Sequence, residues 1–363
     1  LGAPSIGLPA ASGASGPVPQ ILLVTNAAAE RLLGAPLAGM APGTAGRTVE
    51  ADVQVTETPA PARNVVAILR GSDPGLRGQF VALGAHNDHV GYSRPALDHD
   101  SLKAINEARR RLFVSLDEDG DDVLTPEQQA RYVAEGRALR VNVDSLRRLR
   151  PARPDSINNG ADDDGSGSMA LLEIAEAMAA APQRPRRSVL FVWHTAEEKG
   201  LLGARWWTGR PTVARDSIVA QLNIDMIGRG RAGEERNGGP DYVGLIGPQR
   251  LSTELERIAL EVNARQPRPL VFDRALDRNG HPQNIYCRSD HYEYAKYGIP
   301  VAFFFTGLHG DYHQLTDEPQ YIDYPHYARI TRFIHDYAAE VARRDARPAV
   351  DGPKPDPNGS CRQ

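Results

Sequence analysis

The sequence is poor in cysteine: Cys287 and Cys361 are the only two among its 363 residues. So few thiols exclude a disulfide-rich scaffold and a zinc cluster held by cysteine thiolates. One disulfide is still allowed, and the sequence leaves open whether the two cysteines pair.

Long apolar runs and an excess of one charge are also missing. Unbroken apolar stretches such as residues 21–24 and 301–305 fall far short of the ~18 residues that a membrane-spanning helix needs. The 42 basic and 46 acidic residues give a net charge of −4, which supplies no general attraction to nucleic acid. The 41% of hydrophobic residues are enough for a sizeable core. We therefore expect a globular protein of one large or two modest domains, with no transmembrane segment and no nucleic-acid partner.

From residue 64 onward, short apolar segments alternate with amphipathic ones. The apolar segments are bounded by turn residues, as expected for strands that are covered on both faces. Alternation of strands and helices predicts an α/β three-layer sandwich with a mostly parallel central sheet. The expected strands are residues 64–70, 79–85, 188–195, 219–225, 242–246 and 300–306, and the expected helices are residues 168–181, 252–265 and 324–344.

Three segments differ from this pattern. Residues 1–61 are too few for a complete domain of their own; they predict short strands at 20–25 and 48–58, a helix at 27–33, and then a linker rich in proline. Within the α/β domain at 62–346, residues 91–157 carry many charges and no convincing strand, which predicts a mostly helical insertion. Residues 347–363 are expected to be a flexible tail.

Histidine and acidic residues gather where the predicted strands end. In an open α/β sheet, ligands bind at the carboxyl ends of the strands. Crowded carboxylates repel one another unless cations neutralise them, and imidazole with carboxylate suits zinc, cobalt or manganese. Five such positions exceed what one metal with an open position needs, which favours two metals. The five positions are His86-Asn-Asp-His89, Asp162-Asp-Asp164 before the helix at 168, Glu197-Glu198, Asp225 and Asp311-Tyr-His313.

Each of these pieces also has an ordinary interpretation, as a structural histidine, a solvated glutamate pair or an acidic turn. Their coincidence at one predicted edge of the sheet favours the metal site. Taken together and in this order, the motifs resemble the zinc-dependent aminopeptidases of the M28 peptidase family, in its bacterial branch with a protease-associated insert. The matching segments are Gly84-Ala-His-Asn-Asp-His-Val-Gly91, Asn159-Gly-Ala-Asp-Asp-Asp-Gly-Ser-Gly167, Ala196-Glu-Glu-Lys-Gly-Leu-Leu-Gly203, Asn223-Ile-Asp-Met-Ile-Gly-Arg229, Ser289-Asp-His-Tyr292 and Tyr312-His313.

The resemblance implies a role for each matching residue. Two zinc ions per chain are implied, one bound by His86 and Asp225 and the other by Glu198 and His313. Asp163 would bridge the two zinc ions, with Asp162 and Asp164 as the alternatives. The remaining implied roles belong to Glu197 as general base, Tyr312 as donor to the oxyanion, and Asp88 as the residue that orients the imidazole of His86. Asn87 and His89 depart from the family's usual aromatic and small hydroxyl residues; neither is an expected ligand, but both alter the pocket.

The resemblance also implies a function. Two divalent ions would hold a shared water and lower its pKa, so that a metal-bridged hydroxide attacks the peptide carbonyl. The implied activity is that of a secreted or periplasmic exopeptidase acting on peptides, foremost an aminopeptidase. A carboxypeptidase or dipeptidase, a single-zinc glutaminyl cyclase and a non-catalytic receptor-like domain are the alternatives on the same fold. Residues 1–61 resemble the C-terminal part of a protease-associated domain followed by a linker.

The insertion carries a second acidic motif. Residues 117–128 resemble the loop of a calcium-binding EF-hand, with Asp117, Asp119 and Asp121 at loop positions one, three and five and the backbone of Val123 at position seven. Asp122 replaces the usual glycine, and Gln128 replaces the bidentate glutamate. A calcium site and a solvated acidic turn both remain open.

Overall fold

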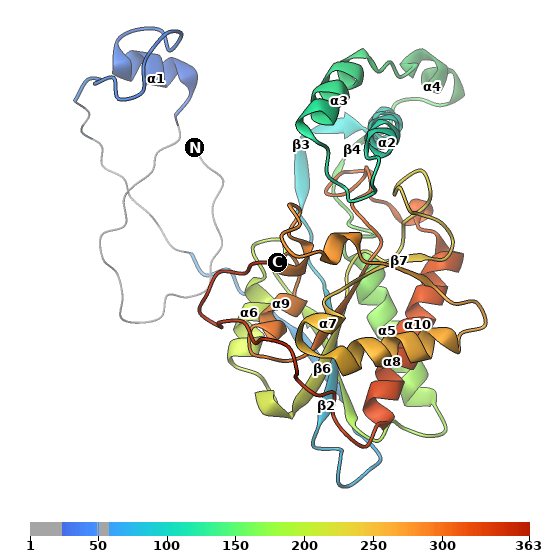
Figure 1. Ribbon diagram of the computed structural model, residues 1–363. Coiled ribbons are helices and arrows are strands. Elements are labelled where there is room, and N and C mark those ends of the chain that lie inside the picture. Colours follow the sequence, from blue (N-terminus) through green and yellow to red (C-terminus); the bar gives the residue numbers. More distant parts are fainter. Residues whose placement is uncertain (1–23, 49, 51–57) are drawn as a thin grey trace. The chain divides into compact units, whose positions relative to one another are not determined.

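The computed structural model describes residues 24–48, 50 and 58–363 (Figure 1). The chain divides into two compact units, Leu1–Pro61 and Ala62–Gln363. In the first unit, helix α1 (Asn26–Leu33) lies where residues 27–33 predict a helix. The strands expected at 20–25 and 48–58 lie almost entirely outside the described residues. The assignment of residues 1–61 to a protease-associated domain therefore stays a prediction.

The second unit is built on a seven-stranded sheet, which confirms the expected α/β class. Its central strands are all parallel, because β5 pairs with β2, β2 with β6, and β6 with β9 in the same direction. The outer pairs β1–β5 and β7–β9 are antiparallel, and β8 adds a short parallel strand to β7. The order is β1 (Val65–Leu69), β5 (Ser188–His194), β2 (Phe80–His86), β6 (Ile218–Ile224), β9 (Val301–Phe305), β7 (Tyr242–Ile246), β8 (Val271–Asp273).

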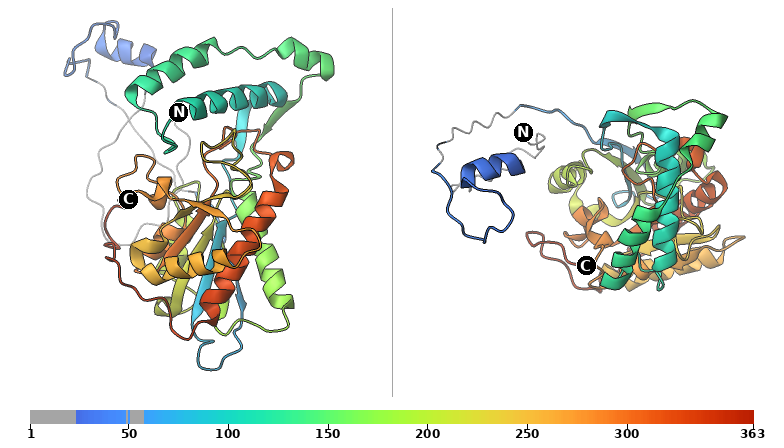
Figure 2. Two further views of the ribbon diagram at one scale, coloured as in Figure 1. Left: turned by 45° about the vertical axis from the view of Figure 1, so that its right-hand side comes forward. Right: turned by 90° about the horizontal axis from the view of Figure 1, so that it is seen from above.

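Helices cover both faces of this sheet (Figure 2). Successive side chains of a buried strand point to opposite faces, so both faces need a covering layer. On β2, Leu83 packs into the core beneath one layer of helices and Ala82 into the core beneath the other. The first layer contains α5 (Gly165–Ala180), α8 (Thr253–Ala264) and α10 (Tyr324–Arg343); the second contains α6 (Leu202–Gly209), α7 (Pro248–Leu251) and α9 (His291–Ala295).

The insertion is mostly helical, as expected, but it also contains a two-stranded antiparallel sheet, so the expectation of no strand there is wrong. Both strands contain proline and are largely exposed, and they pair only with each other. They therefore lack the apolar runs by which buried strands are recognised in a sequence. The elements are β3 (Tyr92–Asp98), α2 (His99–Leu116), α3 (Pro126–Ala138), α4 (Val143–Leu149) and β4 (Pro154–Ile157).

Helix α2 fastens the insertion to loops that follow β6 and β9. Lys103 forms an ion pair with Asp311, and the Asn106 amide donates to the Thr316 hydroxyl at 3.1 Å. The Arg110 guanidinium lies 2.8 Å from a carboxylate oxygen of Glu235. These side chains are buried, so the helix is held by charge pairs that water does not screen.

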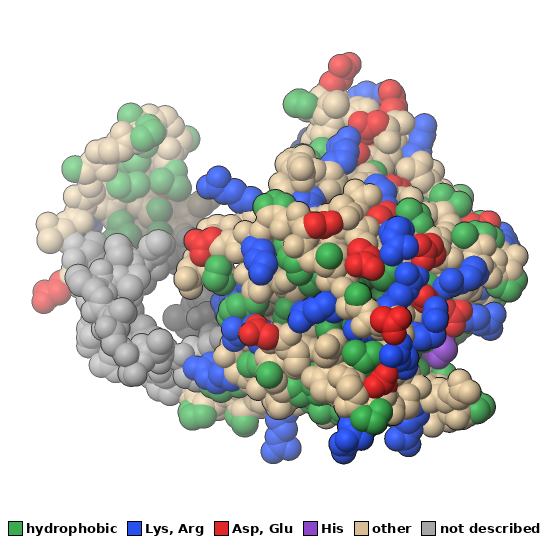
Figure 3. Space-filling model, turned by 60° about the horizontal axis from the view of Figure 1, so that its bottom comes forward, with side chains coloured by type: hydrophobic (Ala, Val, Ile, Leu, Met, Phe, Trp, Pro, Cys, Tyr) green, Lys and Arg blue, Asp and Glu red, His purple; other side chains and the backbone are tan. Residues whose placement is uncertain are grey.

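On the face shown in Figure 3, basic and acidic side chains are interspersed and neither sign forms an extended region. Among the described residues, the structure has no helix that is both long and apolar enough to cross a membrane.

Cys287 and Cys361 form a disulfide, with Cα atoms 5.8 Å apart, which settles the pairing that the sequence left open. The bond anchors the segment 347–363, which has no helix or strand. Next to it, the Gln363 side chain accepts from the backbone N–H of Tyr286 at 3.0 Å and donates to the Arg278 carbonyl at 3.0 Å. This segment is thus attached to the second unit, which differs from the flexible tail that was expected.

Removing the disulfide should destabilise the protein. The two cysteines are 74 residues apart, and linking such distant residues restricts the unfolded chain. We expect Cys361→Ser to lower the free energy of unfolding by about 2–4 kcal/mol, measured by denaturant titration. The exposed neighbour provides the control, Ser360→Ala, which should leave the stability unchanged. Equal stability of Cys361→Ser and wild type would contradict the prediction.

Candidate metal centre

Three adjacent parallel strands bring the candidate residues to one edge of the sheet. His86 is the last residue of β2, Asp225 directly follows β6, and the pair Glu197 and Glu198 lies just after β5. Asp163 immediately precedes the N-cap of α5, and His313 lies in the loop that follows β9. Because the carboxyl ends of parallel strands meet at the same edge, residues far apart in the sequence converge there.

One group of side chains combines His86, Asp163 and Asp225. The His86 Nε2 atom lies 3.1 Å from Asp163 Oδ1 and 3.8 Å from Asp225 Oδ1. A second group forms around His313, whose Nε2 atom lies 3.1 Å from Asp163 Oδ2 and 2.9 Å from Glu198 Oε2. Asp163 thus turns one carboxylate oxygen to each group.

The flanking aspartates have other partners. Asp164 accepts from the backbone N–H of His86 at 2.9 Å and of Gly167 at 2.8 Å. Asp162 accepts from the N–H of Gly228 at 2.6 Å. Both therefore fix the backbone around the site, which leaves the middle carboxylate of the three facing both groups.

The donor atoms of both groups fit a bound cation. His86 Nε2, Asp163 Oδ2 and Glu198 Oε1 are buried and have no hydrogen-bond partner among the described residues. Buried polar atoms in proteins nearly always have a partner, so these atoms need another one. Imidazole nitrogen and carboxylate oxygen together are ligands that zinc accepts.

The charges of these side chains depend on one another. Burial raises the pKa of Asp225 to about 6 and raises that of Glu197 well above its usual range. Burial acts on Asp163 in the same direction, but contact with the imidazoles of His313 and His86 outweighs it and lowers the Asp163 pKa. For His313, burial favours the neutral ring, whereas Asp163 and Glu198 raise the imidazole pKa to about 9.

The contacts of Asp88 differ from those that its implied role requires, because its carboxylate does not orient His86. The Nδ1 atom of His86 lies 3.0 Å from the backbone carbonyl oxygen of Asp88 and 3.8 Å from its carboxylate. The carboxylate instead accepts from the backbone N–H groups of Glu197 at 3.0 Å and Glu198 at 3.3 Å. One residue thus orients the imidazole through its carbonyl and the two glutamates through its side chain.

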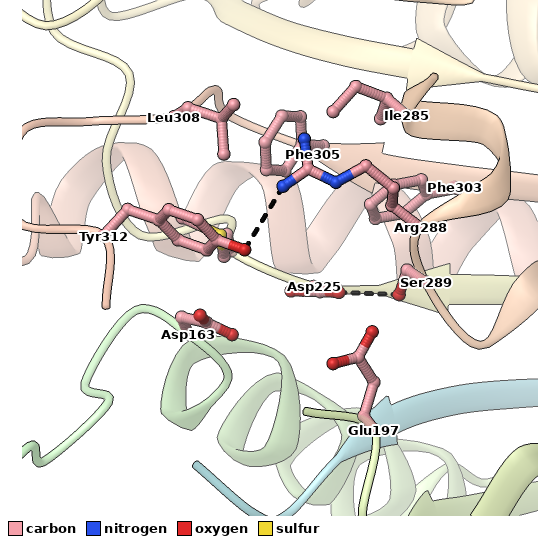
Figure 4. A pocket seen from close by; sticks show the side chains of 11 residues that line it. Asp163, Glu197, Asp225, Ile285, Arg288, Ser289, Phe303, Phe305, Leu308 and Tyr312 are labelled. Atoms are coloured by element: carbon pink, nitrogen blue, oxygen red, sulfur yellow. Dashed lines mark hydrogen bonds between the residues drawn. The ribbon is translucent and has the colours of Figure 1, made fainter. Parts of the chain in front are cut away.

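A pocket opens beside the two groups (Figure 4). Tyr312 lines it, and its hydroxyl oxygen accepts from Arg288 Nη2 at 3.3 Å. The Ser289 hydroxyl donates to Asp225 Oδ2 at 2.6 Å. Burial raises the pKa of Tyr312, so this phenol is protonated at neutral pH. The rest of the wall is largely apolar and includes Met226, Ile285, Phe303, Phe305 and Leu308.

Several of these residues were not expected from the sequence. Ser289 lies in a recognised motif but had no role assigned, and Arg288 and the apolar wall gave no signal because they meet only in the folded chain. His89 is a further case: it was expected only to alter the pocket, yet its Nδ1 atom lies 2.9 Å from Glu198 Oε1.

The acidic loop of the insertion brings three carboxylates close together. Oxygens of Asp117, Asp119 and Asp121 lie within 4.8 Å of one another. Asp122, which replaces the usual glycine, adopts the left-handed conformation with φ 58°. The Gln128 side chain is used elsewhere, because it accepts from the Thr125 N–H at 2.9 Å and caps α3.

The amino-acid sequence is similar to those of known proteins. A 30% identity over 165 residues relates the chain to leupeptin-inactivating enzyme 1 of Streptomyces exfoliatus, covering 42% of this chain and 31% of that protein. Leucine aminopeptidase 1 of Paracoccidioides brasiliensis is 31% identical over 208 residues, which are 53% of this chain and 51% of that protein. The chain thus matches about a third to a half of the length of these relatives.

Among solved structures, the LapA aminopeptidase of Legionella pneumophila aligns with 78% of this chain and 56% of its own, with a TM-score of 0.48 and 17% identity. Residues 143–338, more than half of the chain, match Peptidase family M28. This range includes Asp163, Glu197, Glu198, Asp225 and His313, whereas His86 and Asp88 precede it. The chain belongs to peptidase family M28.

Proposed function

We propose that this protein is a zinc-dependent exopeptidase, foremost an aminopeptidase, that binds two zinc ions. One ion would be held by His86, Asp163 and Asp225, and the other by Asp163, Glu198 and His313. The observation that carries the proposal is the Asp163 carboxylate, which lies 3.1 Å from an imidazole nitrogen on each side. When bound, the zinc ions would polarise the substrate carbonyl and lower the pKa of a bound water.

Glu197 has the properties of the general base. Its carboxylate points into the pocket (Figure 4) and lies 4.0 Å from His86 Nε2. Burial raises its pKa, and proton transfer is most efficient when the pKa of the base lies near the working pH. Glu197 would take a proton from the attacking water and return it to the leaving amine.

Tyr312 is the proposed donor to the oxyanion. Arg288 donates to its hydroxyl oxygen, and a guanidinium cannot accept a hydrogen bond. The hydroxyl proton of Tyr312 is therefore free to be donated into the pocket. A preorganised donor of this kind stabilises the negative charge that forms on the carbonyl oxygen.

The pocket supports an apolar terminal residue as the preferred substrate, because Ile285, Phe303 and Leu308 line it. Arg288 at the same pocket favours a second candidate function. Its guanidinium could bind the terminal carboxylate of a peptide, as a carboxypeptidase or dipeptidase requires.

Peptides with blocked ends separate these functions. We expect hydrolysis of leucyl and phenylalanyl peptides with a free amino group, including those with an amidated carboxyl end, and no hydrolysis of their N-acetylated forms. Release of amino acids is the measurement. Chelator should abolish it and added zinc restore it. Cleavage that instead needs the free carboxyl end would identify a carboxypeptidase, and cleavage restricted to unblocked dipeptides would identify a dipeptidase.

Replacing the base should remove turnover but not the metals. We expect Glu197→Gln to lower kcat at least ~10²-fold, because a positioned proton-transfer group contributes that much or more. Zinc content and the unfolding temperature should stay as in wild type. Glu173→Gln, on an exposed position of α5, makes the same chemical change away from the site and should keep full activity. Turnover of Glu197→Gln within a few-fold of wild type would remove Glu197 from the mechanism.

We also propose a calcium ion in the acidic loop, bound by Asp117, Asp119, Asp121 and the Val123 carbonyl. The support is Asp117, which is 3% exposed and whose Oδ1 atom has no hydrogen-bond partner in the described part of the chain. Burial raises the pKa of this carboxyl. A nearby cation would stabilise its charged form. The Arg278 guanidinium lies 2.5 Å from Asp121 Oδ2 and competes with calcium there, so binding should be weak.

Calcium should therefore raise the unfolding temperature of the wild type at millimolar concentration. Asp119→Ala should remove most of this rise, and Asp117→Ala with Asp119→Ala should abolish it, while peptidase activity is kept. The adjacent exposed acid supplies the control: Glu118→Ala should still respond to calcium. An equal calcium effect in wild type and in both aspartate variants would make the loop a solvated turn.

The disulfide supports a secreted or periplasmic location, because such bonds persist in oxidising compartments.

A further inference from the structure

His89 lies beside the group that contains His313. It is the third residue after the end of β2, and its side chain is only 9% exposed. Its Nδ1 atom lies 2.9 Å from Glu198 Oε1 and 3.8 Å from Asp163 Oδ2. The rings of His89 and His313 have centroids 5.6 Å apart and meet at 74°, so both imidazoles approach the same two carboxylates.

The short contact with Glu198 is not an aligned hydrogen bond. Both ring nitrogens of His89 are buried and without a hydrogen-bond partner in the described part of the chain, and the same is true of Glu198 Oε1. Leaving a buried polar atom without a hydrogen bond lowers stability by about 1–3 kcal/mol. These neighbouring atoms therefore need a partner, and one partner could serve all of them. A cation between them is a partner that nitrogen and oxygen lone pairs can share.

The spacing of the atoms suits a zinc ion. With zinc bonds of about 2.0–2.1 Å, the ligand atoms of a tetrahedron lie roughly 3.4 Å apart. His89 Nδ1 lies 2.9 Å from the Glu198 carboxylate and 3.8 Å from that of Asp163. His313 Nε2 lies 2.9 Å and 3.1 Å from the same two carboxylates. Ligand atoms of His89, Asp163 and Glu198 all lie within 4.8 Å of one another. His89 approaches Oε1 of Glu198 and His313 approaches Oε2, at distances on both sides of the tetrahedral value.

The backbone leaves space for this ring. Gly160 has φ +62°, and a Cβ atom there would lie 2.6 Å from His89 Cγ. Only glycine allows the imidazole to lie so close to the segment that leads into Asp163. The turn that presents the shared carboxylate thus also makes room for this ring.

We propose that His89 Nδ1 is a fourth protein ligand of the zinc ion held by Asp163, Glu198 and His313. This inference rests on the proposed two-zinc function and goes beyond it. The ion would have four protein ligands, as in closed structural sites, whereas the set of His86, Asp163 and Asp225 offers three and keeps a position open. The open set is the one beside Glu197, so the two metals would differ in both affinity and task.

Zinc binding of the 363-residue chain tests the proposal. We expect two zinc ions in wild type and, in His89→Ala, one dissociation constant raised by more than ~100-fold, since a residue that acts only through a ligand costs 10–100-fold. Competition with a chromophoric chelator measures both constants. Asn87→Ala, an exposed neighbour in the same loop, should change neither constant, and Asp163→Ala should weaken both.

X-ray absorption of the zinc-loaded wild type counts the imidazoles and does not depend on any variant. Three imidazoles for two zinc ions support the proposal, and two overturn it. His89→Gln separates a ligand from a positioning residue, because the amide could still donate to Glu198. Affinity restored in His89→Gln would overturn direct ligation, and affinity as low as in His89→Ala would support it.

These outcomes also distinguish a failure of this inference from a failure of the proposed function on which it rests. A wild type that binds no zinc would contradict the proposed function as well as the inference. A wild type with two zinc ions and only two imidazoles would contradict the role of His89 alone.

Discussion

Charge neutralisation in a water-poor pocket is the constraint on which this structure depends. Asp163, Glu197, Glu198 and Asp225 bring four carboxylates together, and the side chain of each is at most 11% exposed. The desolvation penalty of a buried ion is several kcal/mol, and like charges add repulsion. The imidazoles of His86 and His313 offset this only when protonated. Two divalent cations would balance four carboxylates, which is why the proposed zinc pair accounts for the group as a whole.

The scaffold around this group is itself polar. Asp88, Asp162 and Asp164 each use a carboxylate to hold backbone N–H groups rather than to face the pocket. Hydrogen bonds to charged groups are stronger than neutral ones, and here they fix the turns at the strand ends. Several of these turns contain strained residues: Ala196, Met226 and His313 adopt left-handed backbone conformations with φ of 54°, 58° and 56°. Such strain persists only where the surrounding contacts over-determine the backbone.

The sequence predicted the buried strands and the acidic edge of the sheet, because both depend on local patterns. Strands β2, β5, β6 and β9 lie within two residues of their expected ends, since each is a short apolar run between turn residues. The exposed strands β3 and β4 were missed because their residues carry no such pattern. The Arg288 contact with Tyr312 and the approach of His89 to Glu198 could not be predicted either. These contacts join segments more than 20 residues apart, and only the folded chain decides the direction of each side chain.

The site combines residues that lie far apart in the sequence, and this has a consequence for folding. His86 and His313 are more than 200 residues apart, yet both contact the carboxylate of Asp163. Contacts of this range form late, because closing large loops costs chain entropy before the contacts compensate it. A chain in which these long-range contacts have not yet formed would lack the complete group of side chains. The proposed hydrolysis would therefore depend on the folding of the second unit as a whole.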